Sequence, residues 1–199
     1  MIEPLIQQGY VVDRNYITSS QAKYFYEHAL YMETAFNNSP PELYFSKDHH
    51  CQSNDSLFNS VLYSKIPYLE GLFSTEIYPT YNCYRNYTAF CIMRSHTDRD
   101  ACEIGVSLCC GFPENTEPWP FCITDKKGHD YELILYPGDA VIYLGTELAH
   151  WRYAWGETWP KDGRHVQLFF HYVKKNGLSR SEAYDLPADA NKKFDFNDG

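Results

Sequence analysis

The spacing of apolar residues divides the chain into an N-terminal part with helical periodicity and a longer part with the pattern of strands. Thr18 and Gln21 form the capping-box pattern of a helix start, and apolar residues then recur three and four positions apart, which predicts a helix over residues 19–36. Residues 10–12 are expected to form a first strand. Asp55 is placed to cap a second helix.

From Pro79 onward the chain consists of short aromatic and β-branched runs separated by turn residues. Such runs are typical of strands that pack one face against a core. Several short strands preceded by two helices favour a mainly β fold with N-terminal helices, a double-stranded β-helix (jelly roll, cupin-like) with the helices packed on one sheet. The predicted strands cover residues 81–90, 103–110, 119–124, 131–135, 140–144 and 165–173.

The length and composition are those of one globular domain. The 199 residues suffice to bury a core, and no repeat, low-complexity tract or linker divides them. We expect a single domain over residues 1–199, with residues 1–76 as a helical support layer, residues 77–175 as the jelly-roll core and residues 176–199 as a C-terminal tail. The 17% of aromatic residues suit an interior lined by rings.

The charge and the cysteines limit the partners and the compartment. A net charge of −9 disfavours contact with a phosphate backbone, so nucleic acid is not an expected partner. No stretch approaches the roughly 20 apolar residues of a membrane helix, and the N-terminus lacks the features of a signal peptide, so we expect a cytoplasmic protein with no membrane partner. The seven cysteines follow no regular framework and are expected to be free thiols.

A candidate metal site begins with His96 and Asp98, which are separated by one position. In an extended segment two such side chains point to the same side, so an imidazole nitrogen and a carboxylate oxygen can converge on one cation. His150, which follows a predicted strand, is the best candidate for the third ligand of a two-His, one-carboxylate site. Three ligands on one face leave positions open for a bidentate 2-oxo acid and for O2, as Fe(2+) chemistry requires.

Each of these residues also has a simpler interpretation. Taken alone, His96 and Asp98 are more typical of a solvated charged turn, because charged residues surround them. His150 alone is more often a hydrogen-bonded histidine at a strand end. The order and spacing of all three favour the metal site.

Arg164 is a candidate anchor for the co-substrate, because it stands at the head of an apolar strand. On that strand Arg164, Val166 and Leu168 share one face, which we expect to point inward. A guanidinium there needs an anion, and the distal carboxylate of 2-oxoglutarate is expected to provide it. Tyr87, on the strand that leads to His96, is expected to donate its hydroxyl to the same carboxylate. Alone, Arg164 is more often a surface residue paired with an acid.

Other residues near these strands have less specific interpretations. Trp151 and Arg152 follow the distal ligand and are candidates for supporting the metal site or contacting substrate, although a packed Trp and a surface Arg are equally good interpretations. His165 and His171 lie on the strand face opposite to Arg164, so we expect them to point outward or into an interface between sheet and helix.

A polar stretch covers residues 37–55, which are rich in Pro, Asn and Ser and are predicted to form a long loop. His49, His50 and Cys51 lie in it. Because adjacent loop residues rarely present convergent ligands, these three are interpreted as surface residues.

In the order of these motifs the chain resembles the iron(II)/2-oxoglutarate dioxygenase superfamily, in its prolyl-4-hydroxylase-like branch, and especially small bacterial and phage-type members. The resemblance covers residues 77–175 and includes the phrases Ser-His-Thr-Asp-Arg, Pro-Gly-Asp and His-Trp-Arg. It implies a double-stranded β-helix. It also implies that the iron is bound by His96, Asp98 and His150, and 2-oxoglutarate by Arg164 and Tyr87.

The activity that the resemblance implies is the hydroxylation of a small-molecule or peptidyl substrate, with conversion of 2-oxoglutarate to succinate and CO2. Asp98 disfavours halogenation, because a small residue replaces this carboxylate in halogenating relatives. One alternative is a non-oxidative, cupin-like jelly roll that binds a metal or another ligand and for which Arg164 is dispensable. Another is a structural domain that binds no iron. No segment specifies the substrate.

Overall fold

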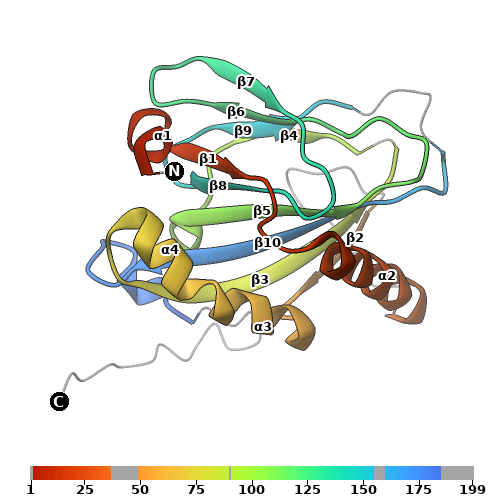
Figure 1. Cartoon of the computed structure of the whole chain (residues 1–199), viewed down its shortest axis with the longest axis horizontal. Helices are drawn as coiled ribbons and strands as arrows, with labels where there is room; N and C mark the ends of the chain where they lie inside the picture. The colour runs from red at the N-terminus through yellow and green to blue at the C-terminus, as the bar shows by residue number, and fades with distance from the viewer. Residues whose placement is uncertain (1, 37–48, 90, 155–159, 185–199) are drawn as a thin grey trace.

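Two antiparallel sheets form the body of the molecule in this computed structural model, which describes residues 2–36, 49–89, 91–154 and 160–184 (Figure 1). The six-stranded sheet has the strand order β1-β8-β5-β10-β3-β2, and the four-stranded sheet has the order β4-β9-β6-β7. The strands are β1 (Tyr10–Asp13), β2 (His49–Ser53), β3 (Ile77–Tyr87), β4 (Met93–His96), β5 (Ile104–Gly111), β6 (Phe121–Thr124), β7 (Asp130–Leu133), β8 (Ala140–Leu144), β9 (His150–Arg152) and β10 (His165–Lys174).

The strands from β3 to β10 divide equally between the two sheets. β3, β5, β8 and β10 form the centre of the larger sheet, whereas β4, β6, β7 and β9 form the smaller one. All strand pairs among the described residues are antiparallel. This arrangement is the double-stranded β-helix that the sequence predicts.

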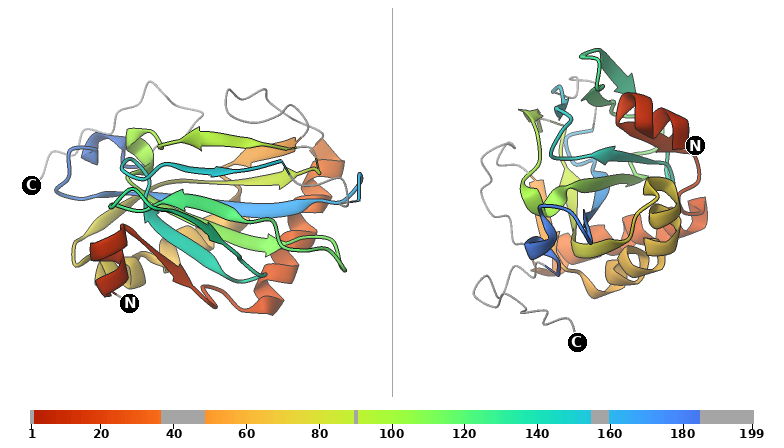
Figure 2. Two further views of the ribbon diagram at one scale, coloured as in Figure 1. Left: turned by 90° about the horizontal axis from the view of Figure 1, so that it is seen from above. Right: turned by 90° about the vertical axis from the view of Figure 1, so that its left-hand side faces the viewer.

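Three helices, α2 (Ser19–Phe36), α3 (Ser56–Ser64) and α4 (Ile66–Phe73), cover the outer face of the six-stranded sheet, and the four-stranded sheet covers its inner face (Figure 2). The capping box predicted at Thr18 is present, because the backbone N–H of Gln21 donates to Thr18 Oγ1 and the backbone N–H of Thr18 donates to Gln21 Oε1. Asp55 caps the next helix through Leu57 N. The chain also forms α1 (Ile2–Gln8) and short 3-10 helices at Asp100–Cys102 and Arg180–Glu182.

The last strand, β10, is buried on both faces. Val166, Leu168 and Phe170 pack in the cluster that joins the sheet to the helices. The residues between them, among which are Phe169 and His171, face the space between the two sheets. The expected orientation of His165 and His171 was therefore wrong: they point into the interior of the β-helix, and the Arg164 side of the strand faces the helices.

Part of the predicted loop over residues 37–55 is wrong, because residues 49–53 form a strand. Residues 37–48 lie outside the described residues. β2 adds an edge strand to the sheet by pairing with β3. His50 and Cys51 are buried rather than on the surface, and the ring of His50 contacts Tyr84 at 3.2 Å between Nε2 and the hydroxyl. Polar composition does not exclude an edge strand, because one of its sides needs no partner.

The seven cysteines all lie within the described residues, and as expected they are buried and form no disulfide. Within the described part of the chain, no helix has both the length and the apolar character needed to cross a membrane.

Phe58 tests how far the helical layer stabilises the sheet. Its fully buried ring lies 5.2 Å from that of Phe25 and 5.5 Å from that of Tyr84, measured between centroids, so it joins α3 to α2 and to β3. We expect Phe58→Ala to lower the free energy of unfolding by about 3–5 kcal/mol, because it leaves a cavity. Urea denaturation measures this change. Tyr63→Ala, on the exposed side of the same helix, should change it by about 0.5 kcal/mol or less, and equal losses in the two variants would contradict the prediction.

Candidate metal centre

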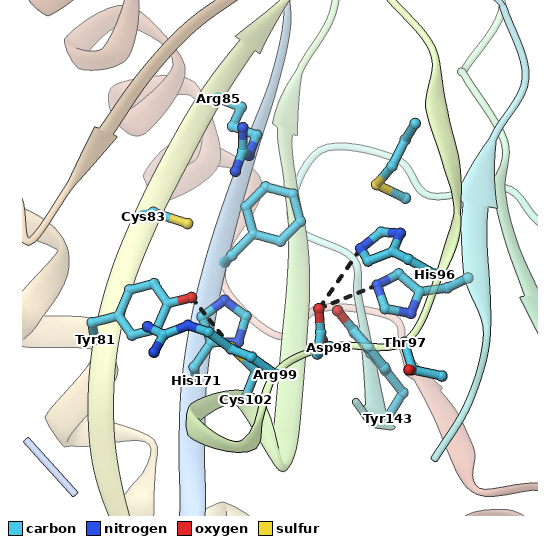
Figure 3. A pocket seen from close by; sticks show the side chains of 13 residues that line it. Tyr81, Cys83, Arg85, His96, Thr97, Asp98, Arg99, Cys102, Tyr143 and His171 are labelled. Carbon is cyan, nitrogen blue, oxygen red and sulfur yellow. Dashed lines mark hydrogen bonds and ion pairs between the residues drawn. The ribbon is translucent and has the colours of Figure 1, made fainter. Parts of the chain in front are cut away.

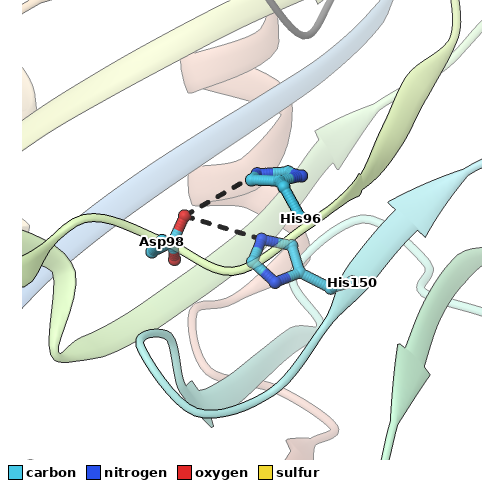
Figure 4. Close-up of side chains that lie close together, drawn as sticks. All are labelled: His96, Asp98 and His150. Atoms are coloured by element: carbon cyan, nitrogen blue, oxygen red, sulfur yellow. Dashed lines mark ion pairs between the residues drawn. The ribbon is translucent and has the colours of Figure 1, made fainter.

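Strand pairing brings the three predicted ligands together. His96 ends β4, His150 begins β9, and the two residues are cross-strand partners with ring centroids 4.4 Å apart. Asp98 follows β4, and its Oδ1 lies 3.8 Å from His96 Nε2 and 3.6 Å from His150 Nε2 (Figure 4). One ligand atom from each residue lies within 4.8 Å of the others. The geometry is that of three ligands directed at one point.

Hydrogen bonds orient both imidazoles. His96 Nδ1 lies 2.8 Å from the Arg94 carbonyl oxygen, and His150 Nδ1 lies 3.1 Å from the Leu148 carbonyl oxygen. Since a carbonyl only accepts, each Nδ1 carries the proton and each Nε2 presents its lone pair toward Asp98. This is the tautomer that a metal requires.

Burial sets the charges of the metal-free site. It lowers the pKa of His150 to about 4, so this imidazole is neutral at pH 7. It also lowers the pKa of His96, with a further contribution from His150. Burial raises the pKa of Asp98 to about 6, against the effects of His96 and of a hydrogen bond from Tyr143. At pH 7 the site therefore offers two neutral nitrogens and one carboxylate, as a divalent cation needs.

Gly145 allows Asp98 to approach the end of β8. The Asp98 amide donates to the Gly145 carbonyl at 2.8 Å. A Cβ at position 145 would lie 2.6 Å from Asp98 Oδ2 and would collide with the carbonyl oxygen of Cys102. Only glycine fits between these groups, so this position fixes the carboxylate ligand.

The ligands lie at the edge of a cavity of about 340 Å3 (Figure 3). Arg85 and Phe169 line it, and Figure 3 shows Tyr81, His171 and Arg99 on the other side of Asp98 from His96. This volume lies within the range of about 300–1,000 Å3 that is usual for small-molecule sites.

The wall formed by Tyr81, His171 and Arg99 is held together by ring contacts. The Tyr81 and His171 ring centroids are 4.6 Å apart, and the Arg99 guanidinium carbon lies 4.9 Å from the Tyr81 centroid. The Tyr81 hydroxyl contacts Cys102 Sγ at 3.2 Å. This wall was not predicted, because strand alternation could indicate that Tyr81 and His171 are each on one face but not which face lines a cavity.

Arg164 lies away from this group. Its Nε donates to Glu33 Oε1 of α2 at 2.9 Å, and Nη1 donates to the carbonyl oxygens of Asp162 and Gly163. Arg164 does not line the cavity that contains the ligands. The structure thus brings His96, Asp98 and His150 together but not Arg164, and its placement does not support a contact with 2-oxoglutarate.

Tyr87 is buried inside the β-helix and does not line the cavity. Its fully buried ring lies 5.3 Å from that of Trp119 and 6.4 Å from that of His165. Burial raises the pKa of Tyr87, and the nearby charges of Arg85 and Arg152 act against that rise. The contact of Tyr87 with a co-substrate stays a prediction.

Arg152 is one of the largest fully buried side chains of the protein, which excludes the surface interpretation. It donates to the Trp119 carbonyl oxygen and, at 3.2 Å, to Gln167 Oε1. Gln167 Nε2 in turn donates to Ser107 Oγ at 2.8 Å. Arg152 stands two residues after His150 on β9, and this spacing was a signal in the sequence that the two side chains share a face.

Comparison with known proteins supports the fold. No family model matches the chain, and no curated protein matches it in sequence. A prolyl-4-hydroxylase from Pseudomonas putida matches with a TM-score of 0.65 at 12% identity, over 87% of this chain and 96% of that one. HygX from Streptomyces hygroscopicus, with nickel and 2-oxoglutarate bound, matches with a TM-score of 0.66 at 9% identity, over 87% and 86%. The non-haem, α-ketoglutarate-dependent epimerase SnoN from nogalamycin biosynthesis matches with a TM-score of 0.67 at 10% identity, over 87% and 81%. The chain therefore shares its fold with these three proteins.

Gly145→Ala tests the approach of Asp98 to β8. The added methyl group must displace the Cys102 carbonyl and the Asp98 carboxylate, so we expect the affinity for Fe(2+) or Co(2+) to fall by about 10- to 100-fold, as when groups that orient a metal ligand are changed. Anaerobic metal titration measures this affinity. Gly71→Ala is the matched control, because a Cβ at Gly71 meets no atom within 4 Å; equal affinities in the two variants would argue against a role for Gly145.

His171 predicts a pH dependence of stability. Burial, with the charges of Arg99, His150 and Arg85, lowers the pKa of His171 to about 3. In the unfolded chain it titrates near 6.5. Between these pH values the unfolded state binds more protons, so stability is lost as the pH falls below about 6.5, by up to about 1.4 kcal/mol per pH unit for this one group.

Urea denaturation of the metal-free protein between pH 7 and pH 4 measures this slope. His171→Phe keeps a ring against Tyr81 and removes the titration, so its stability should fall less steeply than that of the wild type over this range. Identical slopes would mean that His171 is not a neutral buried group.

Proposed function

We propose that this chain is a non-haem iron(II) oxygenase that uses 2-oxoglutarate and O2 to hydroxylate a small-molecule or peptidyl substrate. The observation that carries the proposal is the convergence of His96 Nε2, His150 Nε2 and Asp98 Oδ1 at the edge of one cavity. Two imidazoles and one carboxylate are typical of iron(II) sites that keep positions open for a 2-oxo acid and O2.

The donor set supports a catalytic rather than a structural metal. Among the described residues, no fourth His, Cys, Asp or Glu joins the group. A structural zinc site has four such ligands, often thiolates. Cys102 lines the same cavity, but its sulfur contacts the Tyr81 hydroxyl. The open side of the metal site therefore faces a cavity that can admit a ligand.

When bound, iron(II) would supply the activation of O2 coupled to the conversion of 2-oxoglutarate to succinate and CO2. The residues of the chain would bind, orient and enclose the reactants. Asp98 would neutralise part of the charge of the cation, while the two neutral imidazoles would complete its ligands. The rings of Tyr143 and Phe169 would limit the access of water.

In this proposal the substrate binds in the cavity, against the wall made by Tyr81, His171 and Arg99. This wall offers aromatic surface and one cation, and it lies in the same cavity as the ligands. A small molecule or an extended peptide side chain can enter such a site, whereas the net charge of −9 disfavours a nucleic acid.

Anaerobic titration of the iron(II)-loaded protein with 2-oxoglutarate tests the proposal. We expect the weak visible charge-transfer band of a chelated 2-oxo acid, and succinate release after O2 is admitted. His96→Ala should abolish the band, because the metal loses one of its three ligands. Arg164→Ala should leave the band in place, because Arg164 pairs with Glu33 outside the cavity.

The absence of a band in a wild-type sample that has bound iron would exclude the oxygenase and favour a non-oxidative, cupin-like jelly roll. Metal content measured on the same sample separates this outcome from a failure to bind iron.

A further inference from the structure

A buried cation, Arg152, lies inside the β-helix, and no carboxylate of the described residues pairs with it. The guanidinium of Arg152 is fully buried and donates to the carbonyl oxygen of Trp119 and to the amide oxygen of Gln167. It also lies 4.9 Å from the Trp119 ring centroid. Within the described ranges, no carboxylate lies within ion-pair distance of it. Because buried guanidinium groups are normally paired with anions, this one is suited to an anion that comes from outside the chain.

The position of Arg152 relates it directly to the metal centre. Arg152 stands two residues after His150 on β9, so both side chains point inward, and their Cα atoms are separated by roughly 6.6 Å along the strand. An elongated ligand that binds the metal at one end and runs along β9 reaches Arg152 at the other. 2-Oxoglutarate has this form, since two methylene groups separate its chelating 2-oxo acid from the distal carboxylate.

The last strand has no arginine or lysine on its inner face to fulfil this role. The inward positions of β10 are occupied by His165, Gln167, Phe169 and His171, and Arg164 pairs with Glu33 on the other side of the sheet. Gln167 accepts from Arg152 Nη2, so the guanidinium of β9 reaches the space in front of β10. The positive charge that faces this space is therefore that of Arg152, on β9 of the opposite sheet.

We propose that Arg152 binds the distal carboxylate of 2-oxoglutarate, in place of the Arg164 indicated by the sequence. Gln167 is the positioning residue in this arrangement. Its Oε1 accepts from Arg152, and its Nε2 is fixed by Ser107 Oγ. The inference rests on the proposed function, because it requires a 2-oxo acid to be bound at the metal.

Met93 lines the cavity, whereas Arg152 does not. It is the cross-strand partner of Arg152, and it lines the cavity next to the metal ligands. An unbranched thioether has three rotatable bonds and moves at little cost. The entry of the carboxylate requires Met93 to change its side-chain conformation, while the backbone of β4 and β9 stays in place.

Matched ligands test the proposal without measuring turnover. 2-Oxopentanoate has the same five-carbon chain and the same chelating end as 2-oxoglutarate, but it lacks the distal carboxylate. Anaerobic titration of the iron(II) protein, followed by the charge-transfer band, gives the Kd of each. We expect the wild type to bind 2-oxoglutarate on the order of 100-fold more tightly than 2-oxopentanoate, because the distal carboxylate pairs with a buried cation.

Arg152→Met and Arg164→Met are the matched pair of variants. Arg152→Met should lose most of this preference and still bind 2-oxopentanoate through the metal, whereas Arg164→Met should keep the preference. A preference that survives in Arg152→Met overturns the proposal, whichever other arginine carries it. A wild type that binds iron but neither 2-oxo acid overturns the proposed function as well, so the two failures are distinguishable.

A crystal structure of the wild-type protein with nickel(II) and 2-oxoglutarate would test the same contact, even if Arg152→Met does not fold. A distal carboxylate oxygen within hydrogen-bond distance of the Arg152 guanidinium supports the proposal. A carboxylate bound by another cation overturns it.

Discussion

The pairing of β4 with β9, in the register that sets His96 opposite His150, is the contact on which the candidate metal centre depends. A shift by one residue would turn one imidazole to the other face of the sheet. β9 has only three residues, so the ladder alone specifies this register weakly. Two hydrogen bonds outside it add to the restraint, because the Thr124 amide donates to Ala149 O and the Asp98 amide donates to Gly145 O. The site is thus held by the backbone around its ligands as much as by the ligand strands themselves.

The same register also places Arg152 and its polar partners in the interior, next to the candidate metal centre. With His150 facing inward, Arg152 must face inward as well, and its hydrogen bond to Gln167 joins the small sheet to the large one. Replacing a buried charged group by an apolar one is often neutral or stabilising, so the packing of the fold does not require an arginine here. Its presence among Trp119, Phe121 and Gln167 is better explained by a ligand than by stability.

The grouping of the three candidate metal ligands could be predicted from the sequence, because each of them has a signal in its own segment. His96 and Asp98 are separated by one residue, and His150 follows a strand whose turn is recognisable. The anchor could not be predicted in the same way. Both faces of β10 are buried, but the apolar face packs against the helices and the face with His165, Gln167 and His171 lines the interior, so alternation indicated the wrong face as the inner one. The partner of Arg164 is Glu33, and that contact depends on how α2 packs across the sheet. β2 was missed for a related reason, because an edge strand needs neither apolar periodicity nor turn residues of its own.

The distribution of charge explains how an acidic protein can admit an anionic co-substrate. The net charge of −9 belongs to the whole chain, but the cavity is lined by two arginines, Arg85 and Arg99, and by one carboxylate, Asp98, which a bound cation would neutralise. A third arginine, Arg152, is buried opposite Met93 and does not line the cavity. Low-dielectric surroundings strengthen the field of these charges in the cavity, while solvent screens the acidic exterior within roughly 8–10 Å. A dicarboxylate that approaches the mouth therefore meets a local potential opposite in sign to that of the protein as a whole. The same potential would also attract a substrate that carries an anionic group, so the two ligands of the proposed reaction would share one electrostatic feature of the β-helix interior.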